Sequence, residues 1–315
     1  MKTNKFLVMS MLSATLICSC SSDEEPAAGA SGDAIELIAG IGESTRAVID
    51  ADYANNLDVS FARFDNPGSP GDWRAVNAVR TGGANHTAIT FATKQTYLDT
   101  NGESVLIGYH PRAALTTESD PATVVYTITG DEDIMATEQQ TGASDNRFIP
   151  FTFRHQLTQL QFKCTGSAEA IAKWTAISSI KIQHVATSLT LSLDKAGGVA
   201  LTATGDADQE LEVVNCPAVV ALPSASDPQI GHLMVYPAAD MGTAVSAISL
   251  EVKARYSGSE KTLTVPIDNI TGGVKAGESH LITLNFTVDG EISIEAGIAE
   301  WKPGNGGSSD VIPGA

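Results

Sequence analysis

Basic residues are scarce in this chain of 315 residues, where 19 lysines and arginines face 37 acidic residues and give a formal net charge of −18. Binding to nucleic acid requires a basic surface that neutralises phosphates, so this balance argues against a nucleic-acid partner. Charged residues of both signs together make up only 18% of the chain, whereas apolar residues make up 43%. This composition is typical of a folded globular protein, and the length suits one large or two ordinary domains.

Motifs of common enzymes and metal sites are also missing. The sequence has no C-x-x-C, H-E-x-x-H or H-x-H pattern, no G-x-S-x-G elbow, no P-loop and no dinucleotide-binding fingerprint. The six histidines are spread along the chain, at His86, His110, His155, His184, His232 and His280. We therefore expect no catalytic residue, no metal and no cofactor, and a secreted hydrolase has no residues to support it.

Two polar groups nevertheless need an interpretation. The acidic run Asp131-Glu132-Asp133 lacks the alternating spacing of an EF-hand loop, which favours a solvated turn over a calcium site. His155 follows Phe151 and Phe153 at alternate positions, so a strand would place all three on one face. We predict a hydrogen-bonded structural histidine at the edge of the core rather than a catalytic base.

Helical periodicity is scarce, and only residues 169–176 suit a short helix or turn. The dominant hydrophobic pattern has a period of two, in segments bounded by Gly, Pro, Asn or Asp. These segments are residues 104–109, 123–128, 180–183, 189–193, 248–256, 263–265 and 280–286. Short half-buried strands at such spacing predict an all-β sandwich architecture.

The N-terminus is typical of an export signal. Lys2 and Lys5 precede an apolar stretch at residues 6–17, which is too short for a membrane-spanning helix. The following Ile17-Cys18-Ser19-Cys20 resembles a bacterial lipobox, in which a small residue precedes an acylated cysteine. Ser19 before Cys20 fits that pattern, whereas Ile17 before Cys18 does not. An ordinary signal peptide with incidental cysteines is the alternative.

Lipidation at Cys20 would anchor the protein, because each buried methylene of an acyl chain such as palmitate contributes about 0.8 kcal/mol. Residues 1–19 would then be the signal peptide. Only Cys164 and Cys216 would remain in the folded part. An exported protein can join such a pair in a disulfide, but we favour two buried free thiols.

Several segments together resemble the fimbrillin family of Bacteroidetes, the subunits of type V pili. They are the lipobox with its acidic continuation at residues 21–25, Ser44-Thr45-Arg46-Ala47-Val48, the segments 133–136 and 149–160, and the C-terminal segments 274–284 and 298–301. The second resembles the site where an arginine-specific protease trims family precursors, between Arg46 and Ala47. His280 replaces an aromatic residue that is usual in the family.

The resemblance implies two transthyretin-like (Greek-key) β-sandwich domains in tandem. We place the N-terminal domain at residues 47–146 and the C-terminal domain at residues 147–302. A linker and propeptide would cover residues 20–46, and a flexible tail residues 303–315. The break before Phe148 rests on the polar stretch 138–146.

Two segments have nearly the same pattern of side chains. Residues 35–41 read I-x-L-x-A-x-I and residues 292–298 read I-x-I-x-A-x-I, with Gly and Glu at matching offsets. Strand addition uses backbone hydrogen bonds and alternate side-chain pockets, so both segments could occupy one groove. Ile292, Ile294, Ala296 and Ile298 would then form a donor strand. Alternatively, the two segments simply lie side by side as neighbouring strands.

The sequence thus indicates a non-enzymatic, structural and adhesive fimbrial subunit that is exported as a lipoprotein, trimmed after Arg46 and polymerised by strand exchange. Its expected partners are other fimbrial subunits, the outer membrane through its lipid, and a ligand on a host or bacterial surface. We expect it at the cell outer membrane, exposed to the exterior, and in the fimbrium after processing. The alternative is a surface-anchored β-sandwich lipoprotein that binds a glycan or host protein without polymerising.

Overall fold

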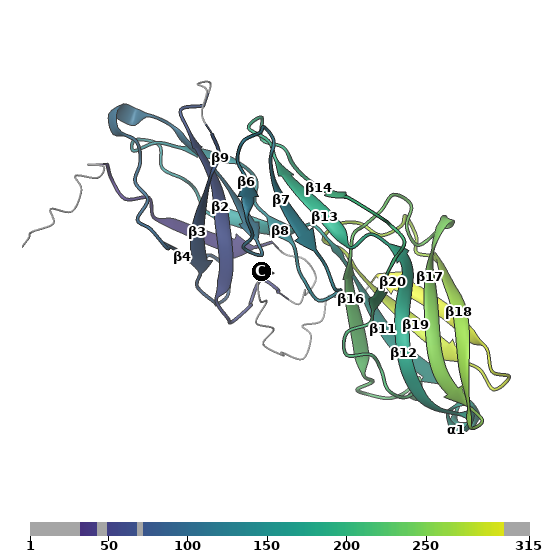
Figure 1. Ribbon diagram of the computed structural model, residues 1–315. Helices are drawn as coiled ribbons and strands as arrows, with labels where there is room; N and C mark the ends of the chain where they lie inside the picture. Colours follow the sequence, from purple (N-terminus) through teal and green to yellow (C-terminus); the bar gives the residue numbers. More distant parts are fainter. Residues whose placement is uncertain (1–31, 43–48, 68–71, 299–315) are drawn as a thin grey trace, which may run out of the picture. The chain divides into compact units, whose positions relative to one another are not determined.

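The computed structural model of the protein describes residues 32–42, 49–67 and 72–298 (Figure 1). The expected signal peptide, Cys20, the processing site at Arg46 and Ala47, and the tail at residues 303–315 lie outside these residues. Strands dominate the described part of the chain, which confirms the all-β prediction.

An eight-stranded sheet contains the first five strands of the chain. Its strands in sheet order are β2 (Leu57–Asp65), β3 (Arg74–Arg80), β4 (Thr87–Phe91), β1 (Leu37–Ile41), β10 (Phe151–His155), β8 (Met135–Ala136), β5 (Ser104–His110) and β9 (Gln140–Gly142). β2 also pairs with β5, which links the two sides of the sheet. β1 therefore lies between two neighbours and is not an edge strand.

Three four-stranded sheets contain the other strands. The first has the order β16 (Ile230–Val235), β11 (Thr158–Gly166), β19 (Ser279–Phe286) and β20 (Ile292–Ile298). The second has the order β15 (Gln209–Glu212), β12 (Trp174–Val185), β17 (Thr243–Tyr256) and β18 (Ser259–Asn269). The third has the order β14 (Val199–Ala203), β13 (Ser188–Leu193), β7 (Ala122–Thr127) and β6 (Leu115–Thr116).

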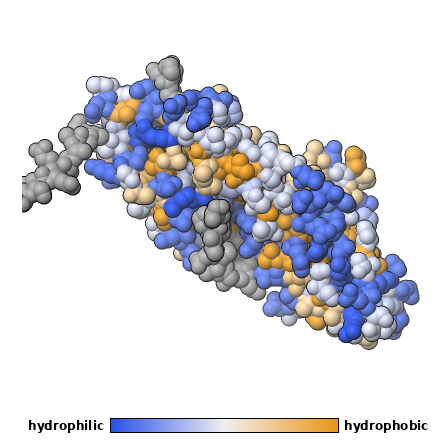
Figure 2. Space-filling view, viewed as in Figure 1, coloured by the Kyte–Doolittle hydropathy of each residue, from blue (hydrophilic) through white to orange (hydrophobic). Residues whose placement is uncertain are grey.

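Alternating burial explains why these segments form strands. β13 buries Leu189, Leu191 and Leu193 and leaves the residues between them partly exposed. β17 buries every second residue from Ile248 to Ala254. Figure 2 shows hydrophilic residues over much of the surface around β12 and β17, as expected for strands with one apolar and one polar face. All seven predicted segments coincide with strands, and only Ile128 lies one residue beyond its strand β7.

Two local predictions need correction. The short helix α1 spans Ala168–Lys173, where the Ser167 side chain accepts a hydrogen bond from the backbone N–H of Ala170 and caps it, and the rest of the segment belongs to β12. β5 is buried on both faces, because side chains pack against it from either side of the sheet. Residues 104–109 were predicted to form a half-buried strand.

Strand pairing connects segments from both sides of the expected domain boundary at residues 146/147. β7 pairs with β13, and β10 pairs with β1. The tandem of two transthyretin-like domains therefore stays a prediction of the family resemblance.

Candidate functional site

The first strand of the fold fills the interior of the eight-stranded sheet. β1 pairs in parallel with β10, where Ala39 and Phe151 are partners, and antiparallel with β4, where Leu37 and Ile89 are partners. We call the place between β4 and β10 that β1 occupies the β1 site. Backbone hydrogen bonds extend the attachment beyond the strand, from Ile35 to Gln95 (2.9 Å) and from Gly42 to Phe153 (2.7 Å).

The inward side chains of this segment belong to the core. The relative exposures of Ile35, Leu37, Ala39 and Ile41 are 5%, 5%, 0% and 6%. They pack in a cluster with residues of β2 to β5, β8 and β10. The cluster includes Phe61, whose ring makes edge contacts with Phe151 and Phe153. The β1 site thus accepts four small or aliphatic side chains at alternate positions, as the sequence pattern predicted.

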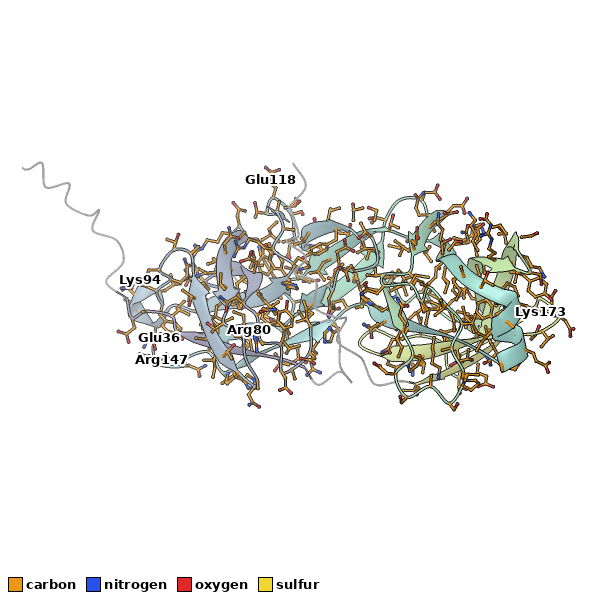
Figure 3. All side chains as sticks on the ribbon, turned by 90° about the horizontal axis from the view of Figure 1, so that it is seen from below. Glu36, Arg80, Lys94, Glu118, Arg147 and Lys173 are labelled. Atoms are coloured by element: carbon orange, nitrogen blue, oxygen red, sulfur yellow. The ribbon has the colours of Figure 1, made fainter. Side chains whose placement is uncertain are left out.

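A buried arginine holds the backbone of β1 from two strands away. Arg80, at the end of β3, has no exposed surface, and its Nε donates a hydrogen bond to the carbonyl of Ala39 (3.0 Å). Its terminal nitrogens donate to the carbonyls of Thr81 (3.3 Å), Gly83 (2.9 Å) and Asn85 (3.0 Å). Burial lowers the pKa of the Arg80 guanidinium. Figure 3 labels Arg80 among the strands of the eight-stranded sheet.

The location of Arg80 has a simple cause in the sheet. β4 begins at Thr87, the pairing partner of Ala39, so the residues of β1 after Ala39 extend beyond the end of β4. The Arg80 guanidinium takes the Ala39 carbonyl at this point and also satisfies three carbonyls of residues 81–85. It thereby organises the connection between β3 and β4 and ties it to β1.

The same connection covers the outer face of β1 at Gly40, whereas Ile38 on that face is 45% exposed. Gly40 is buried although it points away from the core cluster, because His86 lies over it. A Cβ atom at position 40 would lie 3.2 Å from Cδ2 and Nε2 of the His86 ring. Such a distance is tighter than ordinary van der Waals contact, so the β1 site fits glycine best at this position. A glycine inside a strand often marks such a close approach.

The strand β20, which carries the predicted donor residues, forms the edge of its sheet. It pairs with β19 alone, and the pairing runs from the partners Phe286 and Ile292 to the partners His280 and Ile298. Figure 1 shows β20 in yellow beside β19. Ile292, Ile294 and Ala296 are partly buried against the core, whereas Ile298 is 82% exposed. β1 and β20 belong to different sheets, so the alternative that they are neighbouring strands is wrong.

The acidic run at residues 131–133 is only in part the solvated turn that the sequence predicts, because Asp131 and Glu132 are partly exposed but Asp133 is buried. Asp133 is 3% exposed and accepts a hydrogen bond from Nδ1 of His155 (2.8 Å). Asp131 pairs with His232 (3.1 Å), and Glu132 accepts from the backbone N–H of Thr129 (2.6 Å). The three carboxylates therefore serve three separate structural contacts. His155 is the hydrogen-bonded histidine that was predicted.

Two further histidines are buried with altered acidity. His110 donates from Nδ1 to the carbonyl of Asp58 (2.8 Å). Burial lowers its pKa, and the hydrogen bond to Asp58 opposes this effect. His280 is 1% exposed, and burial lowers its pKa while the charge of Glu278 raises it. Both side chains sit inside the fold rather than in an accessible site.

Cys164 and Cys216 are free thiols in the structure, as expected, although only Cys164 is buried and Cys216 is partly exposed. Burial raises the pKa of Cys164, and it raises the pKa of Cys216 to about 11. Among residues 32–42, 49–67 and 72–298, no three His, Cys, Asp or Glu side chains gather as they would around a metal ion. In the same residues, no helix is long and apolar enough to cross a membrane.

Sequence reasoning missed Arg80 and His86. Arg80 ends an alternating strand and reads as a surface charge, and an exposed histidine has no distinctive pattern. Two signals were available: the glycine inside the strand at position 40, and the Thr81-Gly82-Gly83 turn that follows Arg80.

The β1 site and the sheets around it define an all-β protein whose N-terminal strand is an internal part of the fold. A family model described as fimbrillin-like matches residues 30–301, so the chain belongs to the fimbrillin-like family. A comparison with curated proteins gives no match.

Solved structures of similar fold include three proteins from Bacteroides species. A putative cell adhesion protein from Bacteroides uniformis is 16% identical, with a TM-score of 0.60, and the match covers 85% of this chain and 98% of that chain. A putative cell adhesion protein from Bacteroides ovatus is 15% identical, with a TM-score of 0.59 and coverages of 86% and 99%. A fimbrial protein from Bacteroides vulgatus is 11% identical, with a TM-score of 0.50 and coverages of 85% and 99%. At these identities, the likeness concerns the fold.

Proposed function

We propose that the protein is a structural and adhesive fimbrial subunit that joins other subunits by strand exchange. Membership of the fimbrillin-like family supports the fimbrial role. In this account the precursor is exported as a lipoprotein acylated at Cys20, reaches the outer surface of the outer membrane, and enters the fimbrium after trimming between Arg46 and Ala47. The work is assembly and attachment, without catalysis or cofactor.

The observation that carries the proposal is the position of β1 relative to the expected cleavage site. β1 ends at Ile41 and β2 begins at Leu57, so a cut after Arg46 separates β1 covalently from the rest of the chain. The strand would then be held only by its hydrogen bonds and its buried side chains. Its loss leaves two open strand edges, on β4 and β10, above an apolar core.

Residues 292–298 are suited to replace it. They carry apolar side chains at the same offsets as residues 35–41. Their small residues, Ala296 and Gly297, also match Ala39 and Gly40. In their own chain they pair with one strand, whereas the β1 site offers two. Ile298 gains most, because it is 82% exposed on β20 and would take the position of Ile41, which is 6% exposed. Burying such a side chain contributes about 1.5–3 kcal/mol.

The experiment is the intact mass and N-terminal sequence of the protein recovered from cell surfaces. Strand exchange predicts material that begins at Ala47 and migrates as a polymer, and an Arg46→Ala variant that stays monomeric. Surface protein that keeps residues 20–46 and its lipid, with no polymer, would instead support the non-polymerising lipoprotein that binds a glycan or host protein.

A further inference from the structure

We propose that the β1 site requires two small residues in tandem in the strand that it accepts, and that this requirement fixes the register of residues 292–298 from a second copy of this chain. Ala296 and Gly297 of that copy would take the positions of Ala39 and Gly40. This inference rests on the proposed function, in which the β1 site exchanges its strand.

The two positions are restricted on opposite faces of the strand. Ala39 points into the core with no exposed surface, and its carbonyl is held by Arg80. Gly40 points outward under the ring of His86, where a Cβ atom would approach to 3.2 Å. Successive side chains of a strand face opposite sides. The core therefore limits the size of the first residue, and His86 limits the size of the second.

The two adjacent small residues fix the register of the strand, which the alternation of apolar residues alone does not. A strand with apolar residues at every second position can slip by two residues and still present an apolar face. Such a slip would place Ile294 at the position of Ala39 and Glu295 beneath His86. The first side chain overfills the core, and the second displaces the His86 ring. The tandem of small residues therefore leaves one register.

Within its own chain, Gly297 has no evident purpose. It is exposed, and no atom lies within 4 Å of the position of a Cβ atom there. A glycine weakens a strand in such a place, because it gains nothing from its lack of a side chain. The surroundings of Gly297 at the edge of its own sheet do not require a glycine. The β1 site of a neighbouring subunit does, because His86 lies over the position of Gly40.

The partner follows from the same comparison. Ala296 and Gly297 stand at the offsets of Ala39 and Gly40 relative to the flanking isoleucines at 294 and 298. A strand from a second copy thus meets the requirement at every inward position and at the restricted outward position.

The test uses the full-length protein after cleavage by an arginine-specific protease, with polymer scored as ladders on unboiled denaturing gels. Gly297→Val should reduce polymer at least tenfold, while the melting temperature of the uncut protein stays unchanged because the site is open in its own chain. His86→Ala removes the ring atoms that restrict position 40. In the double variant with Gly297→Val it should restore polymer to the wild-type level.

Wild-type amounts of polymer from Gly297→Val, or no rescue by His86→Ala, would overturn the inference. A wild-type protein that forms no polymer would instead overturn strand exchange itself. Gly40→Val gives a second readout that needs no polymer: it should lower the melting temperature of the uncut protein, and His86→Ala should recover most of that loss. An unchanged melting temperature in Gly40→Val contradicts the restriction at this position.

Discussion

The Nε atom of Arg80 lies 3.0 Å from the carbonyl oxygen of Ala39, although β4 separates the strands that carry the two residues. The contact joins the connection between β3 and β4 to β1, the strand that the proposed assembly replaces. When β1 leaves, the guanidinium loses one of its four carbonyl partners. Any incoming strand offers a carbonyl at this place, so Arg80 favours an occupied β1 site over an empty one.

Replacement of Arg80 should therefore destabilise the uncut protein. In Arg80→Met, the buried carbonyl of Ala39 and three partly buried carbonyls lose a donor, which should lower the free energy of unfolding by about 3 kcal/mol. Urea unfolding followed by circular dichroism measures the change. Arg147→Met is the control: Arg147 is 58% exposed in its pair with Asp33, and loss of such a pair costs less than about 1 kcal/mol. Equal losses in both variants would contradict the structural role of Arg80.

The buried histidines His110 and His280 should make the folded protein less stable at acidic pH. Burial lowers the pKa of His110 and of His280 below the value in the unfolded chain, so the unfolded state binds more protons as the pH falls below about 6.5. The free energy of unfolding should therefore fall between pH 7.5 and 5.5, by up to about 1.4 kcal/mol per pH unit for each histidine. His110→Asn, which keeps a donor for the Asp58 carbonyl, should make this fall shallower in urea titrations. The same slope in both proteins would refute the assignment to His110.

The two cysteines of the folded part should be unreactive until the protein unfolds. Burial raises the pKa of both thiols, and the protonated form is a poor nucleophile. Iodoacetamide at pH 8 should label the peptides of Cys164 and Cys216 in urea without reductant, and at least tenfold more slowly in the native protein. Labelling in urea that requires prior reduction would show that the two cysteines form a disulfide.

Acylation should depend on Cys20 and not on Cys18. Ser19 supplies the small residue before Cys20, whereas Ile17 precedes Cys18. Metabolic labelling with a palmitate analogue should therefore mark wild-type protein and Cys18→Ala, but not Cys20→Ala. Equal label in Cys20→Ala would end the lipobox assignment.

The sequence predicts strands well where burial alternates, as in β13 and β17, because period two follows directly from strand geometry. It predicts the strand β5 but not its burial on both faces, because the pattern carries no information on the layers that pack against it. Asp133 and Arg80 read as solvent-facing charges, because their burial depends on partners far along the chain: His155 for one, and the carbonyl of Ala39 for the other. The four apolar positions of the β1 site were predicted; the residues that restrict Ala39 and Gly40 were not.

Two isoleucines of the proposed donor strand, Ile294 and Ile298, differ in how well they can test strand exchange. Ile294 is partly buried in its own chain, so Ile294→Asp would destabilise the monomer and prevent assembly for two reasons. A substitution at Ile298 separates the effect on assembly from the effect on monomer stability. Ile298 is 82% exposed in its own chain and would occupy the position of Ile41, which is 6% exposed, in a neighbouring subunit. Ser293→Asp is the matched control, since Ser293 is exposed and would take the place of Glu36, which is exposed and acidic.

The most direct measurement is the polymer ladder of Ile298→Asp and Ser293→Asp after cleavage by an arginine-specific protease. An unpaired charge in an apolar site costs more than the burial of isoleucine gains. We therefore expect ladders from the wild type and Ser293→Asp, and only monomer from Ile298→Asp, with the same melting curve for all three uncut proteins. A folded Ile298→Asp protein that forms the wild-type ladder would contradict strand exchange through residues 292–298.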